Sequence, residues 1–241
     1  MIKKINDLSD IRGTQPLMSV IQTDFRFPVY DNDGAYIQVV GEEITLVLSL
    51  RGVTANICRL SQNADVEELI SFLSFHQVNN VLSDSFFDGM NLEKRAVLKA
   101  CAQYGNDDGV TVLSSASRLS DYKNVFALLS PKGSFEAWYP AFSRKVNSHN
   151  ANGVYLVDDN IPVSCAVSPF IYGGIGVVAG VFTDENKRRK GFAARCMKAL
   201  LSDMKQKNIE NVYLWCEDKN MKFYEKIGFS VCGEIYVKRE E

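Results

Sequence analysis

The hydrophobic positions change their period along the chain, and these changes predict alternating strands and helices. Residues 43–50, EITLVLSL, have the apolar, β-branched content of a strand. In residues 64–75 apolar side chains recur at three- and four-residue steps after an acidic first turn, which predicts a helix. The same spacing in residues 91–105 predicts an amphipathic helix that ends at a glycine. The pair Asp33-Gly34 between two apolar runs predicts a β-hairpin.

In the C-terminal half the predicted strands and helices are separated more clearly. Residues 152–168 predict two strands around a turn at 158–160, and residues 173–183 predict a third strand that is rich in glycine. Residues 189–208 carry apolar side chains at helical spacing, and residues 211–216 follow as a strand. The remaining predicted elements are helices at residues 135–146 and 219–228 and a final strand or strand pair at residues 229–240.

This succession of elements predicts the fold class and the division into domains. Three strands followed by helix, strand, helix and strand form an α/β pattern, so we expect a central mixed sheet with helices on both faces. The segment 130–133, Ser-Pro-Lys-Gly, is the best boundary candidate because proline and glycine both interrupt regular structure. We therefore expect a smaller α/β domain in residues 1–130 and a second domain in residues 131–241.

Composition and charge exclude several classes of protein. The chain is 46% hydrophobic with a net charge of −2, so no global charge attracts nucleic acid or an anionic membrane. The N-terminal residues lack the apolar run of a secretory signal, and no stretch approaches the roughly 18 apolar residues of a membrane-spanning helix. Six cysteines without a CxxC pair predict buried, reduced thiols. We expect a cytoplasmic protein with no metal site and no membrane or nucleic-acid partner.

The segment 181–194, VFTDENKRRKGFAA, carries the most chemistry. A strand ends, a basic loop follows and a helix opens, so the first helical N–H groups and the helix dipole form an anion site. Gly191 allows the chain to approach a phosphate closely, and the residues before it add positive charge. Neither a Walker loop nor a GxGxxG fingerprint is present. The plain alternative is a solvated basic patch at the start of a helix.

This segment resembles the acetyl-coenzyme A signature of the GNAT superfamily of N-acetyltransferases. The signature Arg/Gln-x-x-Gly-x-Gly/Ala is matched by Arg188, Gly191 and Ala193. Downstream, LWCEDKNMKFYEKIGF matches the family's second motif with Asn220, Tyr224, Gly228 and Phe229. The two motifs keep the order and spacing of the family, and the resemblance covers about residues 135–241.

The resemblance implies a GNAT-type domain, acetyl-coenzyme A as co-substrate and a role for individual residues. The strand end would offer backbone groups to the pantetheine arm, the basic loop and helix start would wrap the diphosphate, and Asn220 would contact the β-alanine portion. Tyr224 would protonate the departing thiolate, and the glycine-rich strand would hold a β-bulge. The residues so implied at the coenzyme are Val181, Phe182, Thr183, Arg188, Arg189, Lys190, Gly191, Phe192, Ala193, Ala194 and Asn220.

The sequence also departs from the family pattern. Glu185 stands where many relatives have a proline. Many relatives carry a glutamate base on the strand before the signature, but residues 172–182 contain no carboxylate or histidine. The other candidates for a water-linked base are Glu217, Asp218 and His149, each also readable as a surface residue.

Three more residues are expected in structural positions. His76 lies in an apolar stretch and is expected to be a structural histidine. Trp138 and Tyr139 are expected to pack in the core, with a place in the acceptor site as the alternative.

We therefore predict an enzyme that transfers an acetyl group to a primary amine of a small molecule or a protein. The alternative is a non-catalytic acyl-coenzyme A binding or sensing protein, which the missing base favours. A nucleic-acid-binding role for the basic cluster is disfavoured, because no second basic patch supports it. We expect the N-terminal region, which is readable as a degenerate copy of the same fold, to bind no coenzyme. The oligomeric state, monomer or homodimer, stays open.

Overall fold

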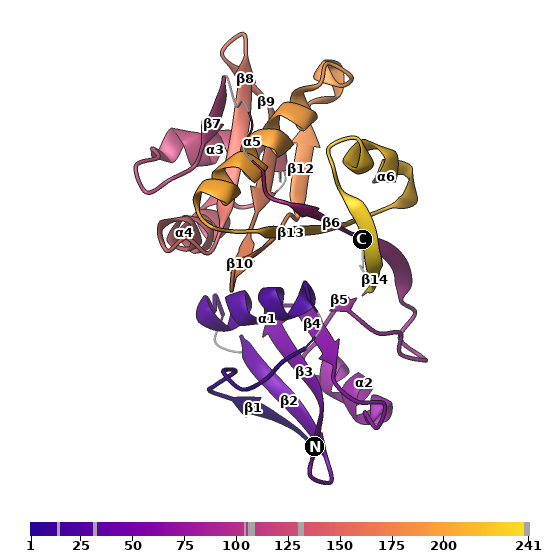
Figure 1. Ribbon diagram of the computed structural model, residues 1–241. Helices are drawn as coiled ribbons and strands as arrows, with labels where there is room; N and C mark the ends of the chain where they lie inside the picture. Colours follow the sequence, from indigo (N-terminus) through magenta and orange to yellow (C-terminus); the bar gives the residue numbers. More distant parts are fainter. Residues whose placement is uncertain (14, 31–32, 104, 106–108, 130–132, 239–241) are drawn as a thin grey trace. The chain divides into compact units, whose positions relative to one another are not determined.

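The computed structural model describes residues 1–13, 15–30, 33–103, 105, 109–129 and 133–238 (Figure 1). The chain forms two compact units that interleave in sequence. The first unit comprises Met1–Val97, Trp215–Asp218 and Cys232–Glu241, and the second comprises Leu98–Leu214 and Lys219–Val231. The boundary predicted at residues 130 and 131 lies in the sequence of the second unit, next to a segment, 130–132, outside the described residues. That boundary stays a prediction.

The elements of each unit follow the α/β pattern. Those of the first unit are β1 (Ile2–Ile5), α1 (Leu17–Arg26), β2 (Gly34–Val40), β3 (Glu43–Arg51), β4 (Thr54–Arg59), α2 (Val66–Phe75) and β5 (Asn80–Ser83). Those of the second are β7 (Val110–Val112), α3 (Leu119–Leu129), α4 (Phe135–Asn147), β8 (Asn152–Asp158), β9 (Ile161–Ser168), β10 (Phe170–Tyr172), β11 (Ile175–Val177), β12 (Gly180–Thr183), the 3-10 helix η1 (Glu185–Lys187) and α5 (Phe192–Gln206). Elements whose residues fall in both units are β6 (Glu93–Cys101), β13 (Asn211–Cys216), α6 (Asp218–Glu225) and β14 (Ser230–Lys238).

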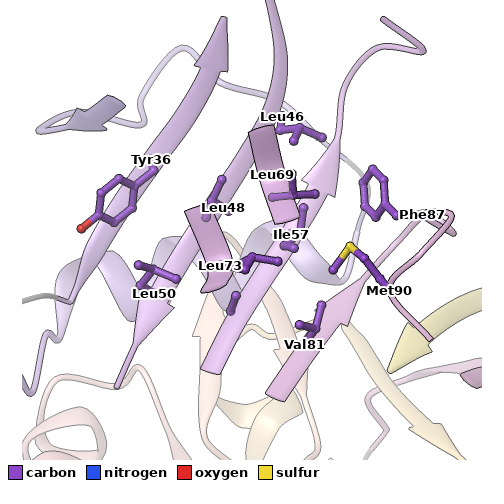
Figure 2. Close-up of a cluster of buried hydrophobic side chains, with 11 residues drawn as sticks. Tyr36, Leu46, Leu48, Leu50, Ile57, Leu69, Leu73, Val81, Phe87 and Met90 are labelled. Atoms are coloured by element: carbon purple, nitrogen blue, oxygen red, sulfur yellow. The ribbon is translucent and has the colours of Figure 1, made fainter. Parts of the chain in front are cut away.

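The first unit is a twisted sheet with a helix on each face. Its strands follow the order β1-β2-β3-β4-β5-β14, antiparallel except for the parallel pair β4–β5. Leu48 and Leu69 belong to the core that α2 forms against one face (Figure 2). On the opposite face, Ser49 of β3 donates a hydrogen bond to Asp24 of α1. Because successive side chains of a strand alternate between faces, the two helices cover the sheet from both sides.

The second unit repeats this layering. Strands β12-β9-β8-β7 form one antiparallel sheet, and β10 and β11 continue to β13 in another. Tyr155, Cys165 and Val167 pack with α3 and α4, whereas α5 contacts β8 and β9. The mixed α/β class with helices on both sheet faces is confirmed.

Several predicted elements are confirmed almost to the residue. The helix predicted at residues 64–75 is α2, the helix at 135–146 is α4 and the helix at 189–208 is α5. The strand pair predicted in 152–168 is the β8–β9 hairpin, whose turn residues Asp159 and Asn160 have positive φ angles of 53° and 62°. The strand at 211–216 is β13, and the last predicted helix and strand are α6 and β14.

The helix predicted at residues 91–105 is wrong, because residues 93–101 form strand β6. Hydrogen-bonding neighbours override the helical spacing of its apolar residues. In the first unit, the Sγ atom of Cys232 on β14 lies 3.6 Å from the carbonyl oxygen of Val97. In the second, the N–H of Ala102, just after β6, donates to the carbonyl of Glu210 at 2.8 Å.

The hairpin predicted at Asp33-Gly34 is also wrong. The Asp33 carboxylate accepts the backbone N–H groups of Val29 and Tyr30 at 2.7 and 3.0 Å, and that of Gly52 at 2.8 Å. The residue therefore closes a loop instead of turning between strands. The hairpin lies one strand later, between β2 and β3, where Gly41 has a φ of +63°.

Candidate functional site

The glycine-rich stretch predicted as one strand is split into β11 and β12 by a β-bulge. β11 pairs in parallel with β13 up to Val177, and the N–H of Val178 still donates to the carbonyl of Tyr213 at 2.8 Å. The next residue, Ala179, donates instead to the carbonyl of Val167 on β9 at 3.1 Å. Gly180 is itself paired with Val167, so two residues of this strand oppose one of β9. From here β12 continues along β9, and β13 is no longer its partner.

Divergence from β13 leaves one edge of β12 unpaired within the described sheet. Asp184 donates its N–H to the carbonyl of Val163 at 2.9 Å, and Gly180 and Phe182 share its side of the strand. Because backbone groups alternate along a strand, those of Val181 and Thr183 face away from β9. A ligand with amide groups can add to such an edge as a further strand would.

Packing explains the glycine at the bulge. A Cβ atom on Gly180 would lie 2.7 Å from Cδ2 of Leu129 and 2.8 Å from Cγ2 of Val167. Both neighbours are branched side chains on different elements, α3 and β9. A side chain here would push these neighbours aside, so space favours glycine, whereas its φ lies outside the left-handed region.

The helix that follows begins without a side-chain cap. Its N-cap, Gly191, has a φ of +82°, in the left-handed region that favours glycine. The first intrahelical hydrogen bond runs from the N–H of Arg195 to the carbonyl of Gly191, so the N–H groups of residues 192–194 have no partner within the helix. No atom lies within 4 Å of a Cβ built on Gly191, so space beside the helix start is open. Unpaired N–H groups and the helix dipole favour an anion at this position.

The basic residues before Gly191 differ in how they are engaged. Lys187 binds Asp158 at 2.7 Å, and this contact lowers the pKa of Asp158 and raises that of Lys187. Arg188 contacts Glu185 at 3.2 Å and donates from Nε to the carbonyl of Thr183 at 3.3 Å. The exposed Arg189 and Lys190 form no ion pair within the described part of the chain. Lys187 is therefore committed to the β8–β9 turn, and Arg188 is engaged by Glu185 and Thr183. Arg189 and Lys190 remain available to an anion.

Helix α6 carries Asn220 and Tyr224 of the second motif. Asn220 is exposed in its first half. Tyr224 is half-buried, with its ring centroid 5.0 Å from that of Phe223 and 6.0 Å from that of Phe229. Its carbonyl accepts the N–H groups of Ile227 and Phe229, which closes the helix into the turn at Gly228. The ring is thus held in place, while the role of its hydroxyl stays a prediction.

The remaining candidates take mainly structural positions. His76 packs against Phe72 and Tyr36, with ring centroids 4.5 and 6.0 Å away, as expected of a structural histidine. Trp138 stacks on Phe142 at 4.5 Å, and Tyr139 lies 5.1 Å from Tyr122 in the same core cluster.

The candidate bases are all at the surface. His149 is exposed in the turn after α4, with a φ of +59°. Glu217 and Asp218 are exposed at the start of α6. Their proposed roles as a base stay predictions.

Two residues of this site escaped the sequence analysis. The glycine content of the strand that contains Gly180 indicated a β-bulge, but it did not show which glycine lies at the bulge. Ser164 contacts β12 from β9, and nothing in the sequence indicated this role. A serine in an apolar strand does not reveal which group its hydroxyl will bind.

With this geometry in view, the comparison with known families decides what the second unit is. A model of the acetyltransferase (GNAT) family matches residues 119–229. This part of the chain is a GNAT domain. The match begins before the segment 135–241 that the motifs indicated, because it includes α3, which packs against β12.

Solved structures share the overall fold of nearly the whole chain. A GCN5-related N-acetyltransferase from Kribbella flavida shares 15% identity and a TM-score of 0.63, over 94% of this chain and 95% of that one. A GCN5-related N-acetyltransferase-like protein from Streptococcus suis shares 13% identity and a TM-score of 0.61, over 95% of each chain. A tandem GNAT protein from the clavulanic acid biosynthesis pathway shares 10% identity and a TM-score of 0.58, over 95% of this chain and 90% of that one.

No curated protein sequence matches this chain. Among the described residues, no helix is long and apolar enough to cross a membrane, and no group of histidine, cysteine and carboxylate side chains could hold a metal ion.

Proposed function

We propose that the GNAT domain transfers an acetyl group from acetyl-coenzyme A to a primary amine. The observation that carries this proposal is the combination of an unpaired strand edge with an uncapped helix N-terminus eight residues further along the chain, from Thr183 to Gly191. An amide-rich arm ending in a diphosphate needs both features in that order. The acceptor, a small molecule or a protein, is not specified by the fold.

The coenzyme would bind through backbone groups first. The edge groups of Val181 and Thr183 would pair with the amides of the pantetheine arm, beside Phe182. The N–H groups of Phe192, Ala193 and Ala194 would receive the diphosphate, and Arg188, Arg189 and Lys190 would add charge. Asn220 on α6 would contact the β-alanine portion.

The chemistry would then need one acid and one base. The amine nitrogen attacks the thioester carbonyl, the carbon–sulfur bond breaks, and the leaving thiolate takes a proton from the hydroxyl of Tyr224. The amine's own proton must leave as well. Since residues 172–182 hold no carboxylate or histidine, we propose that it passes through water toward Glu217, Asp218 or His149.

A coenzyme A release assay with a panel of primary amines tests this function. Turnover with at least one amine is expected, together with one binding site for acetyl-coenzyme A per chain by calorimetry. Detection should use mass or absorbance of the product instead of a thiol reagent, because Cys101 and Cys232 are exposed.

A non-catalytic coenzyme-binding protein is the second candidate, favoured by the lack of a base on the strand before the signature. Tight binding of acetyl-coenzyme A without turnover for any amine would favour it. Absence of binding would contradict both candidates.

A further inference from the structure

A buried hydroxyl on β9 holds the strand whose unpaired edge belongs to the site. Ser164 has no exposed surface and lies opposite Thr183 in the β9–β12 register. Its Oγ atom donates to the carbonyl of Phe182 at 2.8 Å and lies 2.8 Å from Oγ1 of Thr183. Because Ser164 has a single hydroxyl proton, the second bond runs from Thr183 to Ser164.

The strand that carries Ser164 also supports helix α5. α5 packs against β9, and its residue Cys196 is fully buried. The bonds of Ser164 therefore tie β12 to the strand on which the helix with the uncapped start rests.

We infer that Ser164 is a positioning residue that holds β12 on β9, so that the unpaired edge of β12 lies where a bound coenzyme requires it. This inference rests on the proposed function of the site. β12 has β9 as its neighbour on one side, and the edge that would bind the ligand is unpaired on the other. A strand held from one side needs extra bonds to keep that edge in place, and Ser164 supplies two of them within two residues.

The chain offers a matched control on the same strand. Ser168 is equally buried, lies on the same face of β9 and donates to the carbonyl of Val177 at 2.9 Å. That bond holds β11, the part of the split strand that still pairs with β13. Ser168→Ala thus removes a similar bond ahead of the bulge, while Ser164→Ala removes bonds beyond it.

The test compares Ser164→Ala, Ser168→Ala and wild type by calorimetry with acetyl-coenzyme A and by hydrogen exchange of the free protein. Ser164→Ala is expected to weaken binding ~5- to 30-fold, the effect of losing one or two buried hydrogen bonds, with a smaller change for Ser168→Ala. Exchange should accelerate at the amide of Asp184, which bonds to β9 next to Ser164, in the first variant alone. A double-mutant cycle with Thr183→Val should give less than the sum of the two single effects.

Each result has a definite meaning. Wild-type affinity and unchanged exchange in Ser164→Ala would overturn the positioning role and leave the proposed function intact. Equal effects of both serine variants on affinity would also overturn it, because the bond would then be merely structural. If wild type binds no coenzyme, the proposed function fails, and the exchange rates still decide whether Ser164 holds β12 on β9.

Discussion

The two units of this chain contain the same succession of hairpin, strand, helix and parallel strand. Only in the second unit does the pairing of the two parallel strands break off. In the first unit β4 and β5 pair without interruption from Thr54 to Ile57, and the N–H of Asp84 extends the pairing to Ile57 at 3.3 Å. In the second unit the equivalent pair, β11 and β13, ends after Val178, where the bulge turns β12 away. The first pair is thus continuous. In the described part of the second unit, the end of the pairing leaves one edge of β12 without a partner strand.

The helices that follow differ in the same sense. At the start of α2 the Asp65 carboxylate accepts the N–H of Glu68 at 2.9 Å, and Gln38 bonds to the backbone of Asp65 at both ends of its amide. The anion position at this helix is filled by the chain's own carboxylate. At α5 the corresponding residue is Gly191, which has no side chain to place there. In this fold the proposed site lies where a strand edge and a helix N-terminus have no hydrogen-bond partners from the chain's own strands or caps. The succession of elements around them is the same in the two units.

The largest effect is expected when α5 is given the aspartate cap that α2 has. Gly191→Asp would place a carboxylate where the diphosphate is proposed to bind, and we expect a loss of acetyl-coenzyme A affinity of ~100-fold or more. Calorimetry measures the loss. Gly191→Asn is the uncharged control, carries the same backbone penalty and should lose clearly less. Unchanged affinity in the aspartate variant would remove the basis for the coenzyme site.

The second test uses an element that the first unit lacks. No helix lies between β5 and β6, at described residues 84–92, whereas α6 follows β13 and carries Tyr224. Tyr224→Phe keeps the packed ring and removes the hydroxyl, so turnover should fall ~10- to 100-fold while acetyl-coenzyme A affinity is kept. Steady-state kinetics with calorimetry separate the two quantities, and full turnover would end the assignment of Tyr224 as acid.

A third test closes the space at the bulge. Gly180→Ala forces a methyl group against Leu129 and Val167, and we expect a loss of about 1–3 kcal/mol in unfolding free energy with a roughly tenfold loss of affinity. Gly233→Ala is the matched control, because a Cβ there meets nothing within 4 Å. Denaturant unfolding and calorimetry report the two effects. An equal response of both variants would show that the bulge does not depend on Gly180.

The smallest effect is expected in the first unit. Asp65→Ala removes the cap of α2 and should cost about 0.5–2 kcal/mol of stability, while Asp65→Asn keeps an accepting oxygen and should cost less. Neither variant should create a second coenzyme site, because the loop before α2 lacks the basic residues and the glycine. A stoichiometry of two per chain in wild type or variant would contradict the division of roles between the units.

Local signals in the sequence predicted the part of the fold around the proposed site. The glycine, the basic run and the spacing of α5 lie within a short stretch, so their meaning does not depend on distant contacts. The helix α1 was not predicted, and its polar residues Ser19, Gln22, Thr23 and Asp24 are buried together with its apolar ones.

Other features depend on partners far along the chain. β6 carries a helical spacing of apolar residues, yet its hydrogen bonds come from strands more than a hundred positions later, as the pair Lys94–Glu234, 140 positions apart, illustrates. The bulge at Ala179 and the contacts of Ser164 likewise exist only once β9 and β12 have met. Single-sequence patterns do not contain this information.

The return of β14 to the first unit determines how the chain could be divided. Tyr236, Val237 and Lys238 pair with Ser83, Leu82 and Val81, so β5 receives its second neighbour from the far end of the described chain. A fragment that stopped at residue 130 would leave β5 as a bare edge strand presenting Val81 and Leu82, which invites pairing between molecules. During synthesis the same edge must wait unpaired until the whole second unit has been made. Expression of the first unit alone would therefore call for a graft of β14 onto its end to keep it from aggregating.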